Sequence, residues 1–346
     1  MACSIKAAVS VAASSLVLAF SIGLAMTPTM AQAVVVGGDP DDFVVPTGSG
    51  LDGVVRYHTY LGGRAQTKCN GALLKGGRRI LTAAHCLTDS KGKVDRDQVS
   101  VFFDLPGNTV QTPRIGKFKV HPNWNGDLQH GYDVAIIQLE EEAPEAADRY
   151  EIYRGNDEIG RTGQVVGYGR SGNGNDGAQR SPRIRKLSAR NKIDALPEDF
   201  LGVFSNFDDT TPGTQLGFDF DNGEEENDAF GRYIDEPDLG LGEEEGIFAV
   251  GDSGGPTFID GQVAGIHSYL ITNPQRPGRE TSDIDEFHNA SFGEIAFDTR
   301  VSVLADWIDS FEDDHPVQVA DVPAPGMLVL LGFCLSILAG VRSERT

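Results

Sequence analysis

A serine in a run of small residues is the first candidate for chemistry in this chain. Ser253 lies within residues 251–256 (GDSGGP). Glycines on both sides let the backbone turn sharply and let a substrate backbone come close. A serine hydroxyl alone is a weak nucleophile, and it needs a general base that a third group orients. The rest of the sequence therefore has to supply that base and that third group.

Two segments upstream offer these partners. His85 lies in residues 82–86 (TAAHC), and Asp133 lies in residues 131–137 (GYDVAII), where an apolar run begins. Imidazole changes its protonation state near neutral pH, which suits a general base. Taken singly, His85 has the structural alternative of a packed histidine and Asp133 that of a turn cap. Taken together, the three residues indicate nucleophilic catalysis by a serine.

These motifs, in the chain order His, Asp, Ser, resemble the trypsin-like serine proteases of the chymotrypsin fold. The resemblance implies that Ser253 is the nucleophile, that His85 is the general base and acid, and that Asp133 holds the histidine tautomer. It also implies an oxyanion hole made by the backbone N–H groups of Gly251 and Ser253. The alternative is a catalytically inactive relative that serves as a binding, matrix or adhesion protein at the cell surface.

Other stretches carry the same resemblance, which spans about residues 35–311. Residues 166–169 (VGYG) resemble a glycine-flanked aromatic turn of the family. Residues 298–301 (DTRV), followed by Trp307 and Ile308, resemble its last strand and helix. The implied fold is all-β, with two antiparallel six-stranded β-barrels and a C-terminal α-helix. It implies a polypeptide substrate and a serine-type endopeptidase activity.

Apolar and polar patterns predict the elements that position these residues. Short β-type runs at 53–61, 98–104, 134–139 and 163–167 lie between turn residues. Residues 301–311 place apolar side chains at helical spacing and predict one amphipathic helix. Residues 171–246 are less regular, and we expect them to form an acidic, glycine-rich insertion in a protease domain at 34–311.

Two cysteines and the N-terminal valines have further implied roles. Cys69 and Cys86 are expected to form a disulfide, because the chain carries an export signal and the family bridges its histidine loop there. Residues 35–38 (VVGG) resemble the mature N-terminus of the family, whose α-amine pairs with the aspartate before the nucleophile. The expected pair is Val35 with Asp252. Cleavage after Ala33 leaves Val34 first, so this pairing requires a final trim or a shifted insertion.

Specificity residues follow from the same resemblance. Counting back from the serine places Ile247 at the base of the substrate pocket, where trypsins have an aspartate, and this argues against Lys/Arg specificity. Val250 and Leu270 would form an apolar rim, which favours a medium-sized apolar side chain before the cut. His267 offers a rival, since glutamate-specific members have a histidine there, and its structural alternative is a histidine satisfied within a strand. The substrate backbone would pair with residues 265–269, which include Ser268 and Tyr269.

Charge is the main compositional feature. The 346 residues contain 29 Lys and Arg against 51 Asp and Glu, a net charge of −22. Such a surface disfavours nucleic acid and anionic membranes as partners. Twelve carboxylates lie between Asp219 and Glu245. We weigh three interpretations for them: a solvated loop, calcium binding through Asp219, Asp221 and Glu224, and a partner-binding surface. The sequence otherwise predicts no metal and no cofactor.

Both ends of the chain indicate targeting. Residues 1–33 have a basic start, an apolar stretch and the cleavage site AQA, which predicts a signal peptide rather than a membrane anchor. At the other end, a linker at 312–325 finishing in VPAP precedes an uncharged stretch at 326–341 and a basic tail at 342–346. Sixteen helical residues span about 24 Å, which is short for a membrane core of about 30 Å.

The layout of this end resembles the PEP-CTERM sorting tails of Gram-negative bacteria, although Ala324 stands where that family has glutamate. The resemblance implies an exported, secreted or cell-surface protein, transient membrane insertion through the tail, and an exosortase-type processing enzyme as a partner. A plain C-terminal membrane anchor is the alternative.

Overall fold

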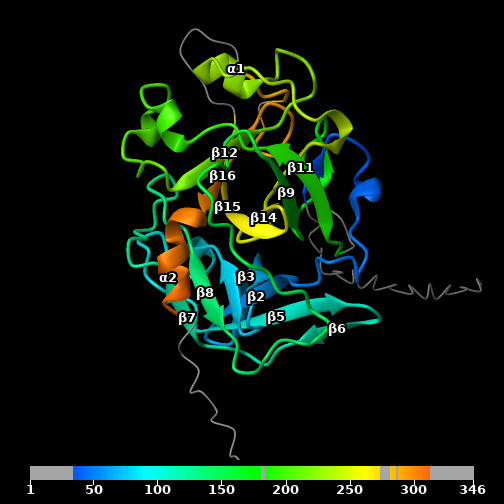
Figure 1. The fold of residues 1–346 in the computed structure, drawn as a ribbon, viewed down its shortest axis with the longest axis vertical. Coiled ribbons are helices and arrows are strands. Elements are labelled where there is room, and N and C mark those ends of the chain that lie inside the picture. The colour runs from blue at the N-terminus through cyan, green and yellow to red at the C-terminus, as the bar shows by residue number, and fades with distance from the viewer. Residues whose placement is uncertain (1–33, 181–183, 273–280, 286, 312–346) are drawn as a thin grey trace, which may run out of the picture.

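The computed structural model describes residues 34–180, 184–272, 281–285 and 287–311. The predicted signal peptide, linker, hydrophobic stretch and basic tail lie outside these residues. Within them, no helix is long and apolar enough to span a membrane. Most strands belong to two large antiparallel sheets, with the sheet of the N-terminal half below and the other above in Figure 1.

The first sheet has seven strands and holds the larger part of the core. The predicted runs at 53–61, 98–104 and 134–139 are its strands β2, β5 and β8. In β2 buried and half-buried residues alternate over most of the strand, as expected where one face packs on a core. Its order is β6 (Asn108–Gln111), β5 (Gln98–Leu105), β2 (Val54–Leu61), β3 (Arg64–Leu73), β4 (Arg79–Thr82), β8 (Ala135–Gln138) and β7 (Phe118–Val120).

The second sheet has six strands and contains the predicted run at 163–167. Two of its strands, β11 and β12, come from residues 171–246, so this segment is in part a piece of the barrel and not an insertion throughout. Its order is β11 (Leu187–Lys192), β9 (Thr162–Gly167), β14 (Pro256–Ile259), β15 (Gln262–Ile271), β16 (Ile295–Arg300) and β12 (Gln215–Asp219).

A small third sheet ties the start of the described chain to the second barrel. Strand β1 (Val35–Val36) pairs in parallel with β10 (Gly172–Asn173) and antiparallel with β13 (Gly246–Ile247). All three valines at 34–36 are fully buried among aromatic and aliphatic side chains of the second barrel. The N-terminal segment is therefore part of the core.

The helices are short. The predicted helix at 301–311 is a 3-10 turn, η6 (Ser302–Leu304), followed by α2 (Ala305–Asp309). α2 packs on the first sheet, where Ile308 is buried and its carbonyl accepts a hydrogen bond from Arg79 at 2.9 Å. The others are η1 (Pro40–Phe43), η2 (Ala84–Cys86), η3 (Pro197–Phe200), η4 (Ser205–Phe207), α1 (Ala229–Ile234) and η5 (Gly242–Glu244).

The all-β fold with two barrels and a C-terminal helix is thus confirmed. The first sheet has seven strands where six were expected, because β6 extends it as a hairpin partner of β5. Strand β4 leads into the turn that carries His85, and the segments that carry Asp133 and Ser253 lead into β8 and β14.

Candidate active site

His85 and Asp133 meet at the end of the first barrel. His85 lies in η2, directly after β4, and Asp133 lies just before β8, which pairs with β4. The turn before Asp133 has left-handed backbone at both Gly131 and Tyr132. The His85 ring donates from Nδ1 to Asp133 Oδ2 at 2.6 Å, and the His85 backbone N–H donates to Oδ1 at 2.8 Å. These two bonds fix the ring, so that Nε2 is the nitrogen left for chemistry.

The two groups shift each other's protonation. Burial by itself lowers the pKa of His85, but the negative charge of Asp133 and the hydrogen bond to it outweigh burial and raise the pKa above its ordinary value. Burial raises the pKa of Asp133, yet the charge of His85 and the hydrogen bonds from His85 and Ser268 lower it overall. The carboxylate therefore stays ionised and stabilises a protonated imidazole.

Ser268 has a role that the sequence did not reveal. We expected it to bind substrate, but its hydroxyl donates to Asp133 Oδ2 at 2.6 Å. Tyr269, the other expected substrate contact, is 6% exposed and donates its hydroxyl to Gln215. Both side chains therefore face the interior, and the pairing of the 265–269 backbone with substrate stays a prediction. The nearest sequence signal was the position of Ser268 next to His267 in β15.

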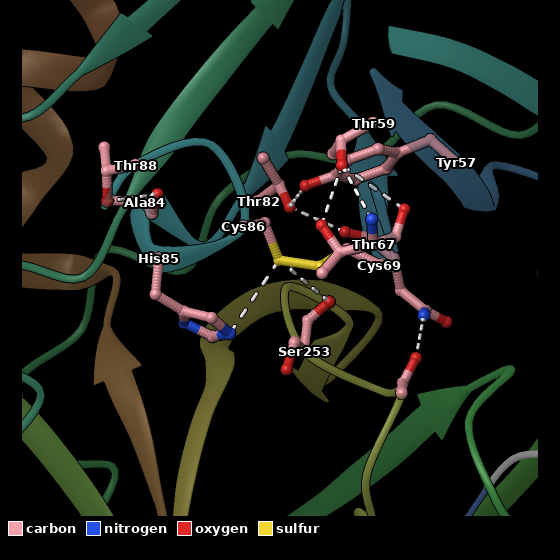
Figure 2. The surroundings of a disulfide bond; sticks show 12 residues. Tyr57, Thr59, Thr67, Cys69, Thr82, Ala84, His85, Cys86, Thr88 and Ser253 are labelled. Carbon is pink, nitrogen blue, oxygen red and sulfur yellow. Dashed lines mark hydrogen bonds between the residues drawn. A yellow bond between two sulfur atoms is a disulfide. The ribbon is translucent and has the colours of Figure 1, made fainter. Parts of the chain in front are cut away.

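Ser253 lies in the loop between β13 and β14, beside the disulfide that joins Cys69 to Cys86. One sulfur of this bond, Cys86 Sγ, is 3.8 Å from His85 Nε2 and 3.9 Å from the carbonyl oxygen of Ser253. Figure 2 shows the serine and the histidine on the same side of the disulfide. Within the described part of the chain the Ser253 hydroxyl makes no hydrogen bond.

Asn70 holds the loop that carries the serine. Its backbone N–H donates to the Ser253 carbonyl at 2.8 Å, and its side-chain amide donates to the Gly251 carbonyl at 2.7 Å. Its side-chain oxygen accepts the N–H of Tyr168 at 2.8 Å. Asn70 is 1% exposed, so these bonds are sheltered from water. No motif pointed to this residue, because its partners lie about a hundred and nearly two hundred residues away.

The backbone N–H groups of Gly251 and Ser253 are the expected oxyanion donors. Neither donates a hydrogen bond to another described residue, so both are available to a ligand. Gly251 has a φ of 101°, and Gly254 has a φ of 79°. A side chain at Gly254 would meet Thr82 Oγ1 at 2.2 Å. Glycine is therefore required for the tight turn around the serine.

The N-terminal contact of Asp252 differs from the expectation by one residue. The backbone nitrogen of Val34, and not that of Val35, lies 3.1 Å from Asp252 Oδ2. Val35 instead pairs with Gly172 and Ile247 in the small sheet. Asp252 is fully buried, and burial raises its pKa to about 6 despite hydrogen bonds from backbone N–H groups. Val34, and not Val35, therefore lies next to Asp252, which corresponds to the shifted insertion.

The expected specificity residues are spread over different environments. Ile247 is fully buried, packed in the same cluster as the N-terminal valines, whereas Val250 is 47% exposed and Leu270 is half-buried. His267 is fully buried, with its ring edge-on to Phe248 at a centroid distance of 4.5 Å. His267 therefore does not face a substrate, and its ring is not hydrogen-bonded within the strand, so it matches neither of the two alternatives expected from the sequence.

The surroundings of His267 explain why its ring is neither hydrogen-bonded nor charged. Its Nδ1 lies 3.9 Å from Asp298 Oδ1, too far for a hydrogen bond, and neither ring nitrogen has a hydrogen-bond partner among the described residues. Burial lowers the pKa of His267 to about 3 and raises that of Asp298 to about 7. The imidazole is therefore neutral at ordinary pH and carries no charge for a substrate carboxylate.

Comparisons with known proteins agree with this geometry. The family model described as Trypsin matches residues 52–193, a range that contains His85 and Asp133 and ends before Ser253. A comparison with curated protein sequences found no significant match. Among solved structures, the chain is similar to neuropsin, a serine protease expressed in the limbic system of mouse brain. That match has 17% identity and a TM-score of 0.52, and covers 78% of this chain and 97% of neuropsin. The chain therefore has the trypsin-like two-barrel fold, which in general terms supports proteolysis.

Proposed function

We propose that this chain is a serine endopeptidase that hydrolyses peptide bonds through Ser253, His85 and Asp133. The observation that carries the proposal is the hydrogen-bonded pair of His85 and Asp133, with Ser253 on the other side of the imidazole and two unused N–H groups in the serine loop. Acyl transfer requires a nucleophile, a base, a carboxylate that orients the base, and donors for the oxyanion.

In this mechanism the Ser253 oxygen attacks the carbonyl carbon of the scissile peptide while its proton passes to His85 Nε2. The oxyanion that forms accepts hydrogen bonds from the N–H groups of Gly251 and Ser253. His85 then gives the proton to the leaving amine, and an acyl-enzyme remains. Water hydrolyses this ester by the same route in reverse, with His85 again as the base. Asp133 stabilises the imidazolium in both halves.

Export and N-terminal cleavage belong to the same proposal. Cleavage after Ala33 would convert the Val34 nitrogen into an α-amine next to the buried Asp252 carboxylate, whose charge is costly to leave unpaired. No further trim is then needed. Protein that begins at Val34 should be active, and protein that begins at Ala33 or Val35 should lose most activity. N-terminal sequencing of the active enzyme checks this, and full activity from a Val35 start contradicts it.

We further propose an apolar side chain before the cut. Ile247 offers no charge at the expected pocket base, and His267 is buried and neutral, which argues against glutamate. Peptides that differ only by Leu, Ala, Glu or Arg before the cut test this choice. Efficient cleavage after Glu or Arg would overturn it.

Labelling by a fluorophosphonate probe tests the proposal as a whole. The probe forms a covalent bond only with an activated serine, so wild-type protein beginning at Val34 should be labelled. Ser253→Ala and His85→Ala should both abolish labelling while they leave the fold intact, which circular dichroism verifies. Folded wild-type protein that does not react would refute the proposal and favour a catalytically inactive binding or surface protein.

A further inference from the structure

Three buried carboxylates meet at the end of the second barrel farthest from the first sheet. Asp219 ends β12, Asp221 follows two residues later, and Asp228 directly precedes α1, the helix at the top of Figure 1. One oxygen from each lies within 4.8 Å of the others. All three side chains are at most 3% exposed. Water therefore does little to screen their mutual repulsion.

Two of these carboxylates have backbone partners and the third has none. Asp219 accepts the N–H of Phe230 at 2.7 Å, and Asp228 accepts the N–H of Gly231 at 2.6 Å. Asp221 is 2% exposed, and its Oδ1 has no hydrogen-bond partner in the described part of the chain. A buried carboxylate oxygen without a partner is costly, and native structures rarely leave one unexplained. One Asp221 oxygen therefore lies with those of Asp219 and Asp228, and no hydrogen bond from the described residues offsets the burial of Oδ1.

The charges that act most strongly on Asp221 are all negative. The Asp219 and Asp228 carboxylates lie in the cluster with it, and the Glu245 carboxylate binds its backbone N–H. The nearby cation Lys192 forms ion pairs with Asp194 and Asp238 instead. No Lys or Arg among the described residues forms an ion pair with Asp219, Asp221 or Asp228, and a bound cation would supply the missing positive charge.

We propose that Asp219, Asp221 and Asp228 bind a calcium ion. Any two oxygens bound to one calcium ion lie at most about 4.8 Å apart, which is twice the usual calcium–oxygen distance. One oxygen from each of the three carboxylates satisfies this limit. Magnesium keeps most of its water and is held by one or two carboxylates, so three buried carboxylates favour calcium. Glu224, which the sequence suggested as the third ligand, is exposed and outside the cluster, and Asp228 takes its place.

This site would stabilise the loops beside the substrate pocket. The Glu245 carboxylate accepts the N–H of Asp221 at 2.9 Å, and the Asn191 amide bridges the backbone carbonyls of Asp219 and Gly246. Gly246 and Ile247 form β13, next to the N-terminal strand. A cation at the carboxylates would therefore fix the segment that leads to the serine loop.

Thermal unfolding of Ser253→Ala protein beginning at Val34 tests the site without self-digestion. After treatment with EDTA, calcium at a hundred times its dissociation constant should raise the melting temperature by about 5 °C. Magnesium at the same concentration should give a smaller rise. Terbium luminescence, excited through nearby aromatic residues, should report direct binding at a ratio of one ion per chain.

Asp221→Asn is the decisive variant, because it keeps the shape of the side chain and removes the unpartnered charge. It should abolish both the calcium shift and the terbium signal, and in EDTA it should melt at a higher temperature than the parent protein. Glu224→Gln is the matched control from the same acidic segment and should change neither. Absence of a calcium shift in the parent, or loss of the signal in Glu224→Gln but not in Asp221→Asn, would overturn the proposal. Neither result depends on proteolysis.

Discussion

Replacement of Asn70 by alanine is the sharpest test of how the serine loop is held. The substitution removes the hydrogen bond from the side-chain amide to the Gly251 carbonyl and the one from the Tyr168 N–H to the side-chain oxygen. It leaves the backbone bond from Asn70 to Ser253 in place. Gly251, whose N–H is an expected oxyanion donor, then loses the side chain that holds its carbonyl. Asn70 acts through Gly251 and is therefore a positioning residue.

The size of the effect follows from the burial of these partners. A buried polar group left without a partner costs about 1–3 kcal/mol, and Tyr168, at 4% exposed, has no access to water for a replacement. Gly251 is half-buried, so water partly replaces its lost bond. We expect a loss of about 2–3 kcal/mol in the free energy of unfolding. Loss of one oxyanion donor lowers kcat by about 10²–10³. Because Gly251 is displaced and not removed, we expect a fall of about 10–100-fold.

Steady-state kinetics on an apolar peptide p-nitroanilide, with enzyme concentration fixed by active-site titration, measures this fall. Thr59→Ala is the matched control, because Thr59 is also buried and its hydroxyl makes hydrogen bonds, with the N–H and the hydroxyl of Thr67, that do not touch the serine loop. It should lose similar stability while keeping kcat within about threefold. Equal kcat losses in both variants, or an unchanged kcat in Asn70→Ala, would refute the positioning role.

Three further outcomes are expected. Because His85 must be neutral to accept a proton, kcat/KM should fall as the pH drops through the raised pKa of His85. Asp133→Asn should move this acidic limb of the pH profile to lower pH. An acidic limb that does not move contradicts the pairing of His85 with Asp133. Replacing Cys69 and Cys86 together by alanine should lower the free energy of unfolding by about 3 kcal/mol in urea titrations, as for a closed loop of this length. His267→Asn should change the preference for Leu over Glu peptides by less than about twofold, and a larger change would restore a role in specificity.

Local patterns in the sequence predicted many of the strands and singled out the residues proposed to react. Alternating apolar residues gave the strand at 53–61, and the short motifs around His85, Asp133 and Ser253 could be found because each motif is contiguous. The Cys69–Cys86 bond followed from two cysteines remaining in the body of the chain. These predictions depend on residues that are close in the sequence and not on contacts between distant segments.

Contacts between distant segments could not be predicted in this way. Ser268 lies 135 residues from Asp133, and no sequence pattern near either residue predicts their hydrogen bond. Burial could not be predicted from the sequence either. Glu224 and Asp228 lie in the same acidic run, yet Glu224 is exposed and Asp228 is buried. The same limit applies to the N-terminus, where a run of three valines is compatible with two registers and only packing selects Val34.

The segment from Glu245 to Asp252 connects three parts of the molecule that would otherwise act separately. At its start, the Glu245 carbonyl accepts the N–H of Gly37 at 2.7 Å, while its side chain binds the loop of the acidic cluster. At its end, Asp252 contacts Val34. Both ends of the segment are therefore held by the N-terminal residues 34–37, and one end also by the acidic cluster. The Gly251 N–H lies within this segment. Cation binding and N-terminal cleavage should therefore cooperate, because each one orders part of the same backbone and lowers the entropy cost of the other.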